Sequence, residues 1–180
     1  MNLITNSSWI QTYSGKPFWP LEPELGEIDI VDIAHALSMQ CRYSGHTKRF
    51  YSVAEHSIHI SNSVSPENAL WGLLHDASEA YLVDIPRPLK PYLPQYKEAE
   101  TRCMLAIAKM VGLAWPEPTE VKEMDTRILF NERAALLSTS VREWGLTGEP
   151  IPNLEIQAWS PRAAEVFFID RFEKLTGWEL

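Results

Sequence analysis

Residues 52–84 read SVAEHSIHISNSVSPENALWGLLHDASEAYLVD and contain the pattern that decides the fold. Apolar residues recur here every three or four positions, which is the spacing of one face of an α-helix. A serine precedes the first apolar segment and a Ser-Pro pair opens the second, both typical beginnings of helices. The stretch predicts two helices, over 52–63 and 66–84, which lie antiparallel across a short turn.

The same helical spacing continues on both sides of this stretch and indicates an all-α fold. It predicts further helices over residues 29–40, 95–111, 119–144 and 161–176. No segment alternates convincingly between apolar and polar residues, as a strand would. We therefore expect one helical bundle that spans residues 1–180.

Three parts are expected within this single domain. Residues 1–28 are rich in proline, glycine and aromatic residues and predict an irregular arm with room for one short strand. Residues 29–140 form the core that carries the chemistry, and residues 141–180 form a C-terminal loop and helix.

Composition excludes several classes of protein. The 180 residues have 45% hydrophobic content and a net charge of −8. This acidic balance is a poor match for a nucleic-acid polymer. No apolar run is long enough to cross a bilayer, and the N-terminus lacks the pattern of a signal peptide. Cys41 and Cys103 are expected to be reduced thiols, and the protein is expected to be cytoplasmic.

Two histidines and a carboxylate interrupt the apolar faces of the two central helices. His56 lies in line with Val53 and Ile60, so its side chain is expected to point toward the core. His75 and Asp76 lie within an apolar segment, where an ionised carboxylate is costly unless a cation or metal pairs with it. An antiparallel packing of the two helices would bring His75 and Asp76 opposite His56.

Asp125 supplies a second carboxylate of the same kind on the helix predicted over 119–144. It lies in line with Val121 and Ile128 on an otherwise apolar face. Two imidazoles and two carboxylates suit one divalent transition metal such as Mn, Co, Fe or Zn. Four protein ligands leave positions for water and substrate, as hydrolytic metal catalysis requires.

Other polar residues have simpler interpretations. His35 is surrounded by apolar residues and is expected to be a buried structural histidine. His59 falls on a more polar face of its helix and is expected to be solvated. Glu132 is expected to pair with Arg133 or another exposed partner.

These residues resemble the H…HD…D signature of the HD-domain metal-dependent phosphohydrolases. Two longer stretches strengthen the resemblance, YSVAEHS over 51–57 and HDASEAYLVDIPRP over 75–88. They are similar to segments of bacterial 5′-deoxynucleotidases and of small phage enzymes that hydrolyse dATP. The resemblance covers roughly residues 29–140. It implies an HD-domain fold in which His56, His75, Asp76 and Asp125 hold one metal.

The resemblance also implies roles for residues around the metal. Glu79 would be a general acid or base, and Asp84 would orient or activate the attacking water. Arg42 and Tyr43 resemble an Arg-aromatic pair that contacts the nucleotide, although Tyr43 stands where the family has tryptophan. Relatives are commonly dimers or rings, so a homo-oligomer is implied.

Cations cluster in sequence around the same region and predict an anionic small-molecule substrate. The expected substrate-binding residues are Arg42, Tyr43, His46, Arg49, Arg87 and Lys90. The leading hypothesis is a phosphohydrolase that acts at the 5′ phosphate of deoxynucleotides, as a monophosphate 5′-nucleotidase or as a triphosphohydrolase such as a dATPase. Mg²⁺ is a further option with a triphosphate.

Two other classes remain open from the residues. One is a non-catalytic nucleotide-binding module, which the presence of Glu79 and Asp84 disfavours. The other is a di-iron oxygenase on an HD fold, which needs histidine ligands between the His-Asp pair and the last aspartate. The chain has no histidine after His75.

Overall fold

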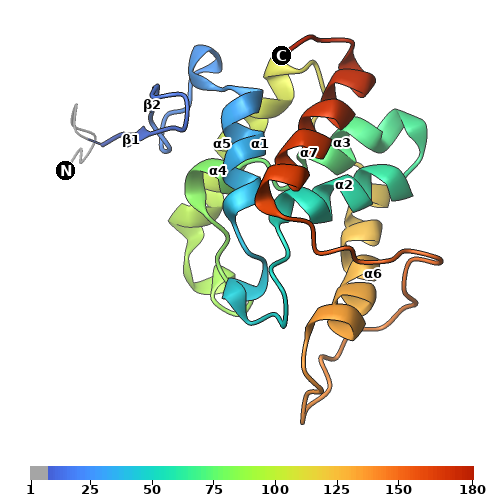
Figure 1. The fold of residues 1–180 in the computed structure, drawn as a ribbon. Helices are drawn as coiled ribbons and strands as arrows, with labels where there is room; N and C mark the ends of the chain where they lie inside the picture. The colour runs from blue at the N-terminus through green and yellow to red at the C-terminus, as the bar shows by residue number, and fades with distance from the viewer. Residues whose placement is uncertain (1–7) are drawn as a thin grey trace.

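The computed structural model describes residues 8–180, and within them the chain is mostly helical (Figure 1). The α-helices are α1 (Ile30–Met39), α2 (Val53–Ser63), α3 (Ala69–Leu74), α4 (Glu79–Leu82), α5 (Pro94–Met110), α6 (Thr119–Leu136) and α7 (Pro161–Thr176). Short 3₁₀ turns are η1 (Leu25–Glu27), η2 (Tyr43–Gly45), η3 (Pro66–Asn68) and η4 (Lys90–Tyr92). This confirms the expected all-α class.

Side-chain caps set the beginnings of several helices. Asp29 accepts a hydrogen bond from the Val31 amide at the start of α1, and Ser52 accepts one from the Glu55 amide at the start of α2. Such caps satisfy backbone donors that have no partner within the helix. Helices predicted over 29–40, 52–63, 95–111 and 161–176 are confirmed within a residue or two at each end.

The helix predicted over 66–84 is not continuous. It is divided into η3, α3 and α4, with a turn over residues 75–78. In this turn the amides of Ala77 and Glu79 donate to the carbonyls three residues earlier, at Leu74 and Asp76, so the backbone winds more tightly than an α-helix. Side chains of adjacent residues on a regular α-helix point about 100° apart. The turn instead lets His75 and Asp76 approach the same point.

The helix predicted over 119–144 is also shorter than expected, since α6 ends at Leu136. A polar Ser-Thr-Ser run begins at residue 138, and the following segment crosses the surface to α7. Side chains of α6 hold this segment: Arg127 donates to the carbonyls of Glu149 and Pro150, and Asn131 donates to that of Ile151.

Helix α7 contributes Ala164, Phe168 and Phe172 to the hydrophobic core, although it lies outside the region over 29–140 that is expected to carry the chemistry. It lies alongside α1 in the centre of the molecule and also packs on α2 and α3 (Figure 1). Phe168 and Phe172 on α7 are completely buried, whereas Phe167 is 43% exposed.

The N-terminal arm forms a small hairpin rather than a single strand. Strands β1 (Ile10–Gln11) and β2 (Pro17–Phe18) pair antiparallel, and Phe18 is buried in the core. Residues 1–7 of the predicted arm, including the start of the sequence examined for a signal peptide, lie outside the described residues. Within the described part, Ser14 bonds the Asp32 carboxylate on α1 through its amide and its hydroxyl.

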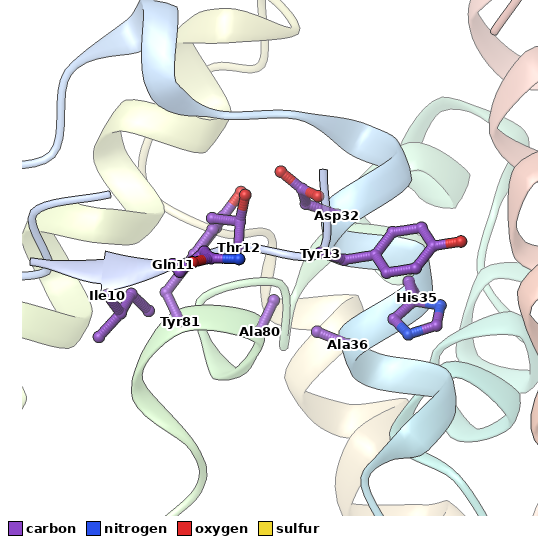
Figure 2. Close-up of a pocket in the computed structure, with 9 residues that line it drawn as sticks. All are labelled: Ile10, Gln11, Thr12, Tyr13, Asp32, His35, Ala36, Ala80 and Tyr81. Carbon is purple, nitrogen blue, oxygen red and sulfur yellow. The ribbon is translucent and has the colours of Figure 1, made fainter. Parts of the chain in front are cut away.

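A cavity of about 310 Å³ lies between this hairpin and helices α1 and α4 (Figure 2). In it the ring of Tyr13 stacks on that of His35 with 3.6 Å between ring centroids. His35 also lies 3.2 Å from the Glu165 carboxylate, and its side chain is 28% exposed. His35 is therefore a structural histidine as predicted, but it is half-buried rather than buried.

Two further expectations can be compared with the described residues. Both cysteines are free thiols. Among residues 8–180, no helix combines the length and the apolar character needed to cross a membrane.

The backbone of α3 lies close to that of α2 at Gly72. A Cβ atom at this position would lie 2.9 Å from the Ser61 Cα, where there is no space for it. Gly72→Ala should therefore lower the free energy of unfolding by about 1–3 kcal/mol, the usual cost of an overpacked core. Urea denaturation measures the change. Gly26→Ala is the control, because its Cβ would meet no atom within 4 Å. Equal unfolding midpoints for the two variants would contradict the predicted crowding.

Candidate metal site

Three side chains from separate parts of the chain converge at one point. The His56 Nε2 atom on α2 lies 3.2 Å from the Nε2 atom of His75, which follows α3. It also lies 3.3 Å from Oδ1 of Asp125 on α6. One ligand atom from each of these residues lies within 4.8 Å of the other two, so the group could hold a metal ion. We call these three residues the metal trio.

Asp76 lies directly beside the metal trio. Its Oδ2 atom is 3.3 Å from His75 Nε2 and 3.6 Å from His56 Nε2. The same oxygen is 3.4 Å from an Arg42 guanidinium nitrogen. The structure thus brings together all four residues that the sequence predicted as metal ligands, with Asp76 shared between the trio and an arginine.

The second nitrogen of each histidine is held by the protein. His75 Nδ1–H donates to the Gly72 carbonyl over 2.8 Å, and His56 Nδ1–H donates to the Glu132 carboxylate over 2.7 Å. These bonds orient the rings and direct both Nε2 atoms toward the centre of the site. Partners of this kind are typical of histidines that bind metals.

Glu132 is the residue that the sequence prediction missed. It was expected to pair with an exposed cation, but its side chain is 0% exposed. It contacts His56 and Arg42 and accepts a short hydrogen bond from the Tyr43 hydroxyl. Burial opposes ionisation of Glu132, but the charges of Arg42 and His56 outweigh it and lower its pKa to about 2. Its position seven residues after Asp125, on the same helix face, was the available signal.

Arg42 and Tyr43 contact the protein around the metal trio. Arg42 bridges Asp76 and Glu132, and its side chain is 14% exposed. Burial opposes its charge, yet the surrounding carboxylates raise the pKa of Arg42. Burial and the nearby Glu132 charge raise the pKa of Tyr43, so its hydroxyl remains a donor. Their predicted contact with a nucleotide stays a prediction.

The charges within the site favour a bound cation. Burial opposes protonation of His75, but Asp76 and Asp125 outweigh it and raise the pKa of His75 to about 10. Burial likewise opposes ionisation of both aspartates. His75, His56 and Arg42 nevertheless lower the pKa of Asp76, and His56 and His75 lower that of Asp125. In the metal-free protein a proton on His75 supplies the positive charge.

The two predicted catalytic carboxyl groups lie in different surroundings. Glu79 begins α4 and is 6% exposed, and burial with the charges of Asp76 and Asp84 raises its pKa. Asp84 is half-exposed and lies 2.9 Å from the Lys90 ammonium group. Burial thus favours the protonated form of Glu79, whereas Asp84 lies near the surface beside a cation.

A cavity of about 240 Å³ lies against the metal trio and is strongly polar. Its lining includes His75, Asp76, Glu79, Lys90, Trp115, Glu117, Lys122 and Asp125. The segment between α5 and α6 supplies Trp115 and Glu117, which the sequence reading did not single out because they lie among prolines outside any helical pattern. Burial raises the pKa of Glu117.

Of the predicted substrate-binding cations, Lys90 lines this cavity and Arg42 contacts Asp76 and Glu132. His46, Arg49 and Arg87 are exposed. Within residues 8–180 none of these three side chains contacts the metal trio or lines the cavity. Their part in substrate binding stays a prediction.

The expectation that His59 is solvated is wrong. Its exposure is 8%, and its ring stacks on Trp159 with 5.5 Å between centroids. The neighbouring Glu55 is fully buried and accepts hydrogen bonds from the amides of residues 157–159. The polar face of α2 is thus covered by a segment about a hundred residues away, and His59 is structural.

Comparison with known proteins places the chain in a family. No family model matches it. It is 40% identical over 172 residues to the uncharacterized protein YfdR of Escherichia coli strain K12, which covers 94% of this chain and 96% of YfdR. It is 34% identical over 125 residues to an uncharacterized protein of Rhodobacter capsulatus, which covers 64% of each. The chain belongs to the family of YfdR.

The raised pKa of His75 predicts how metal affinity depends on pH. Below about pH 10 the metal-free protein holds a proton on His75 that a metal ion must displace. Apparent affinity for Mn²⁺ should therefore rise with pH, by about tenfold per unit from about pH 6.5 to 8.5 for one displaced proton. Calorimetry in buffers of different ionisation enthalpy measures both the affinity and the proton release. A pH-independent affinity without proton release would contradict this assignment.

Glu132→Gln tests whether the buried carboxylate supports His56. Loss of its charge should weaken Mn²⁺ binding by about 10- to 100-fold, as is usual when a histidine ligand loses its carboxylate partner. Calorimetry gives the affinity, and circular dichroism confirms that the variant is folded. The control is Glu120→Gln, on the same helix, where the carboxylate contacts Ser65 and Asn68 instead. The same Mn²⁺ affinity in both variants would show that the Glu132 carboxylate does not contribute to metal binding.

Proposed function

We propose that this protein is a metal-dependent phosphohydrolase of the HD-domain type that cleaves the phosphoester at the 5′ phosphate of deoxynucleotides. The observation that carries the proposal is the convergence of His56, His75 and Asp125 beside a cavity that also holds the buried Glu79. The helical fold and the H…HD…D resemblance support it. A hydrolytic site needs a metal, a water and a proton donor in one place.

The donor set fits one divalent transition metal. Two imidazole nitrogens and carboxylate oxygens are ligands that Mn, Co, Fe and Zn accept. Both Nε2 atoms point to one centre because their Nδ1 partners are already bound. His56, His75, Asp76 and Asp125 would hold the ion. When bound, it supplies Lewis-acid polarisation of a phosphate oxygen and acidifies water.

The remaining residues supply proton transfer and orientation. Burial beside other acids raises the pKa of Glu79, which favours the protonated form that would donate to the leaving 5′ oxygen. Asp84, held by Lys90, accepts the proton of the attacking water. The Arg42 guanidinium group lies between Asp76 and Glu132. It orients both carboxylates and supplies positive charge beside the metal ligands.

The charge of the cavity favours a monophosphate substrate. Its lining carries five carboxyl groups and two lysines. Lys90 is already paired with Asp84 and Glu100, and Lys122 lies 3.9 Å from Glu117. Few cations therefore remain to neutralise the β- and γ-phosphates of a triphosphate. These phosphates would add further negative charge to a cavity that is already rich in carboxyl groups. We therefore place the monophosphate 5′-nucleotidase ahead of the triphosphohydrolase.

The other two classes have less support. The di-iron oxygenase would need additional histidine ligands, and the chain has none after His75. A non-catalytic nucleotide-binding module would not need a buried acid such as Glu79 beside its ligands. Purified protein with about two irons per chain would favour the first, and tight nucleotide binding without turnover would favour the second.

A substrate panel under Mn²⁺ and Co²⁺ tests the proposed reaction. Deoxynucleoside mono-, di- and triphosphates are compared, and the released phosphate and tripolyphosphate are quantified. We expect phosphate release from monophosphates. Tripolyphosphate from dATP would favour the triphosphohydrolase, and no product from any nucleotide would contradict the proposed function.

Two substitutions assign the roles within the site. Asp76→Ala should abolish turnover and weaken metal binding, because a metal ligand is lost. Glu79→Gln should retain the metal and lower kcat by about 10²- to 10⁴-fold, the usual contribution of a general acid. Glu165→Gln is the control, since Glu165 contacts His35 outside the site. Turnover at the wild-type rate in Asp76→Ala would refute the metal assignment.

A further inference from the structure

Trp115 gives the polar cavity its one broad apolar surface. Met104 and Trp115 are the apolar residues of its lining. Met104 is 6% exposed, whereas Trp115 is 45% exposed. A large aromatic side chain that stays exposed beside a cavity loses the stabilisation that burial would supply. Because Trp115 also lines the cavity, its exposed ring is available to a ligand there.

The backbone around Trp115 is anchored. The Trp71 Nε1–H donates to the carbonyl of Ala114 over 3.2 Å. Trp71 is 4% exposed, and its ring lies 6.0 Å from that of Trp115 at an angle of 53°. A buried tryptophan on α3 thus holds the exposed one in place from the side, so a ligand that stacks on Trp115 meets an ordered surface.

We propose that Trp115 is the stacking platform for the base of the nucleotide. The inference rests on the proposed function, because it assumes that the phosphate lies at the metal trio. The same cavity is lined by His75 and Asp125 of the trio and by Trp115. A ligand with a phosphate and a planar aromatic ring matches these two features, and bases stack well on aromatic side chains.

The other aromatic group near the site does not fit this role. Tyr43 lies 6.0 Å from Trp144, but neither residue lines the cavity. The Tyr43 hydroxyl is engaged by Glu132, and Arg133 lies over the Trp144 ring. Tyr43 therefore contacts Glu132, the partner of His56. We assign the contact with the base to Trp115 instead.

If bases stack on Trp115, a nucleotide with any base should bind more tightly than the sugar phosphate that lacks a base. Every base has an aromatic face, so an indole platform discriminates weakly among bases. Polar groups at the ring edge would select the base, and Glu117, half-buried in the same cavity, is placed for that contact. The measurable signature is the difference between a nucleotide and its base-free sugar phosphate.

Binding measurements test this difference without turnover. Calorimetry with Mn²⁺ compares dAMP with 2-deoxyribose 5-phosphate, both added to protein that carries Glu79→Gln to slow hydrolysis during the titration. In this background Trp115→Ala should weaken dAMP binding by about tenfold, or about 1.4 kcal/mol. The affinity for the sugar phosphate should stay the same. Trp115→Phe should retain most of the affinity. Trp178→Ala is the matched control, since Trp178 is 43% exposed and contacts Phe172 away from the cavity.

The outcomes separate this inference from the proposed function. If Trp115→Ala lost the same affinity for dAMP and for the sugar phosphate, Trp115 would have a structural role and the inference would be overturned. Unchanged affinity for both compounds would also overturn it. Neither result bears on the proposed function, because turnover is measured separately in protein that retains Glu79. Absence of turnover by wild-type protein would overturn the proposed function, while a base-dependent loss of binding in Trp115→Ala would still support the platform.

Discussion

The hydrogen bond between His56 and the buried Glu132 carboxylate is the interaction on which the site depends. Neither side chain is exposed, and a carboxylate without water is tolerated only when charged and polar partners compensate it. Its partners are His56 on α2, Arg42 directly before η2 and Tyr43 at the start of η2, whereas Glu132 itself is on α6. One carboxylate thus ties together three segments and turns His56 toward the metal trio.

Around this bond, carboxyl groups of similar chemistry have pKa values shifted in opposite directions. Asp76 is ionised because His75, His56 and Arg42 surround it. Glu79 lies in the same cavity, where burial and the charges of Asp76 and Asp84 outweigh those of Arg42 and His75 and raise its pKa. Carboxyl groups whose pKa values are pushed apart suit ligand and proton-donor roles within one site. The positive charge that the ionised acids require comes from Arg42 and, without metal, from protonated His75.

Residues with a local signal were predicted well. His56 and Asp125 each interrupt an apolar helix face, and the helices that carry them were recognised from spacing and caps. Glu132 had the same signal but was assigned an exposed partner, because nothing near it in sequence points to Tyr43 or Arg42 as its contacts. His59 was assigned to solvent because the covering Trp159 is a hundred residues distant.

The helical class, most helix boundaries and the four converging residues could be predicted from local patterns, because they depend on side-chain periodicity and capping within a few turns. The sharp turn after His75, the orientation of His56 by Glu132 and the place of Trp115 in the cavity lining became visible in the folded chain alone. These features depend on contacts between distant segments, where the removal of water decides which polar groups must find partners. Local periodicity contains no information about that choice.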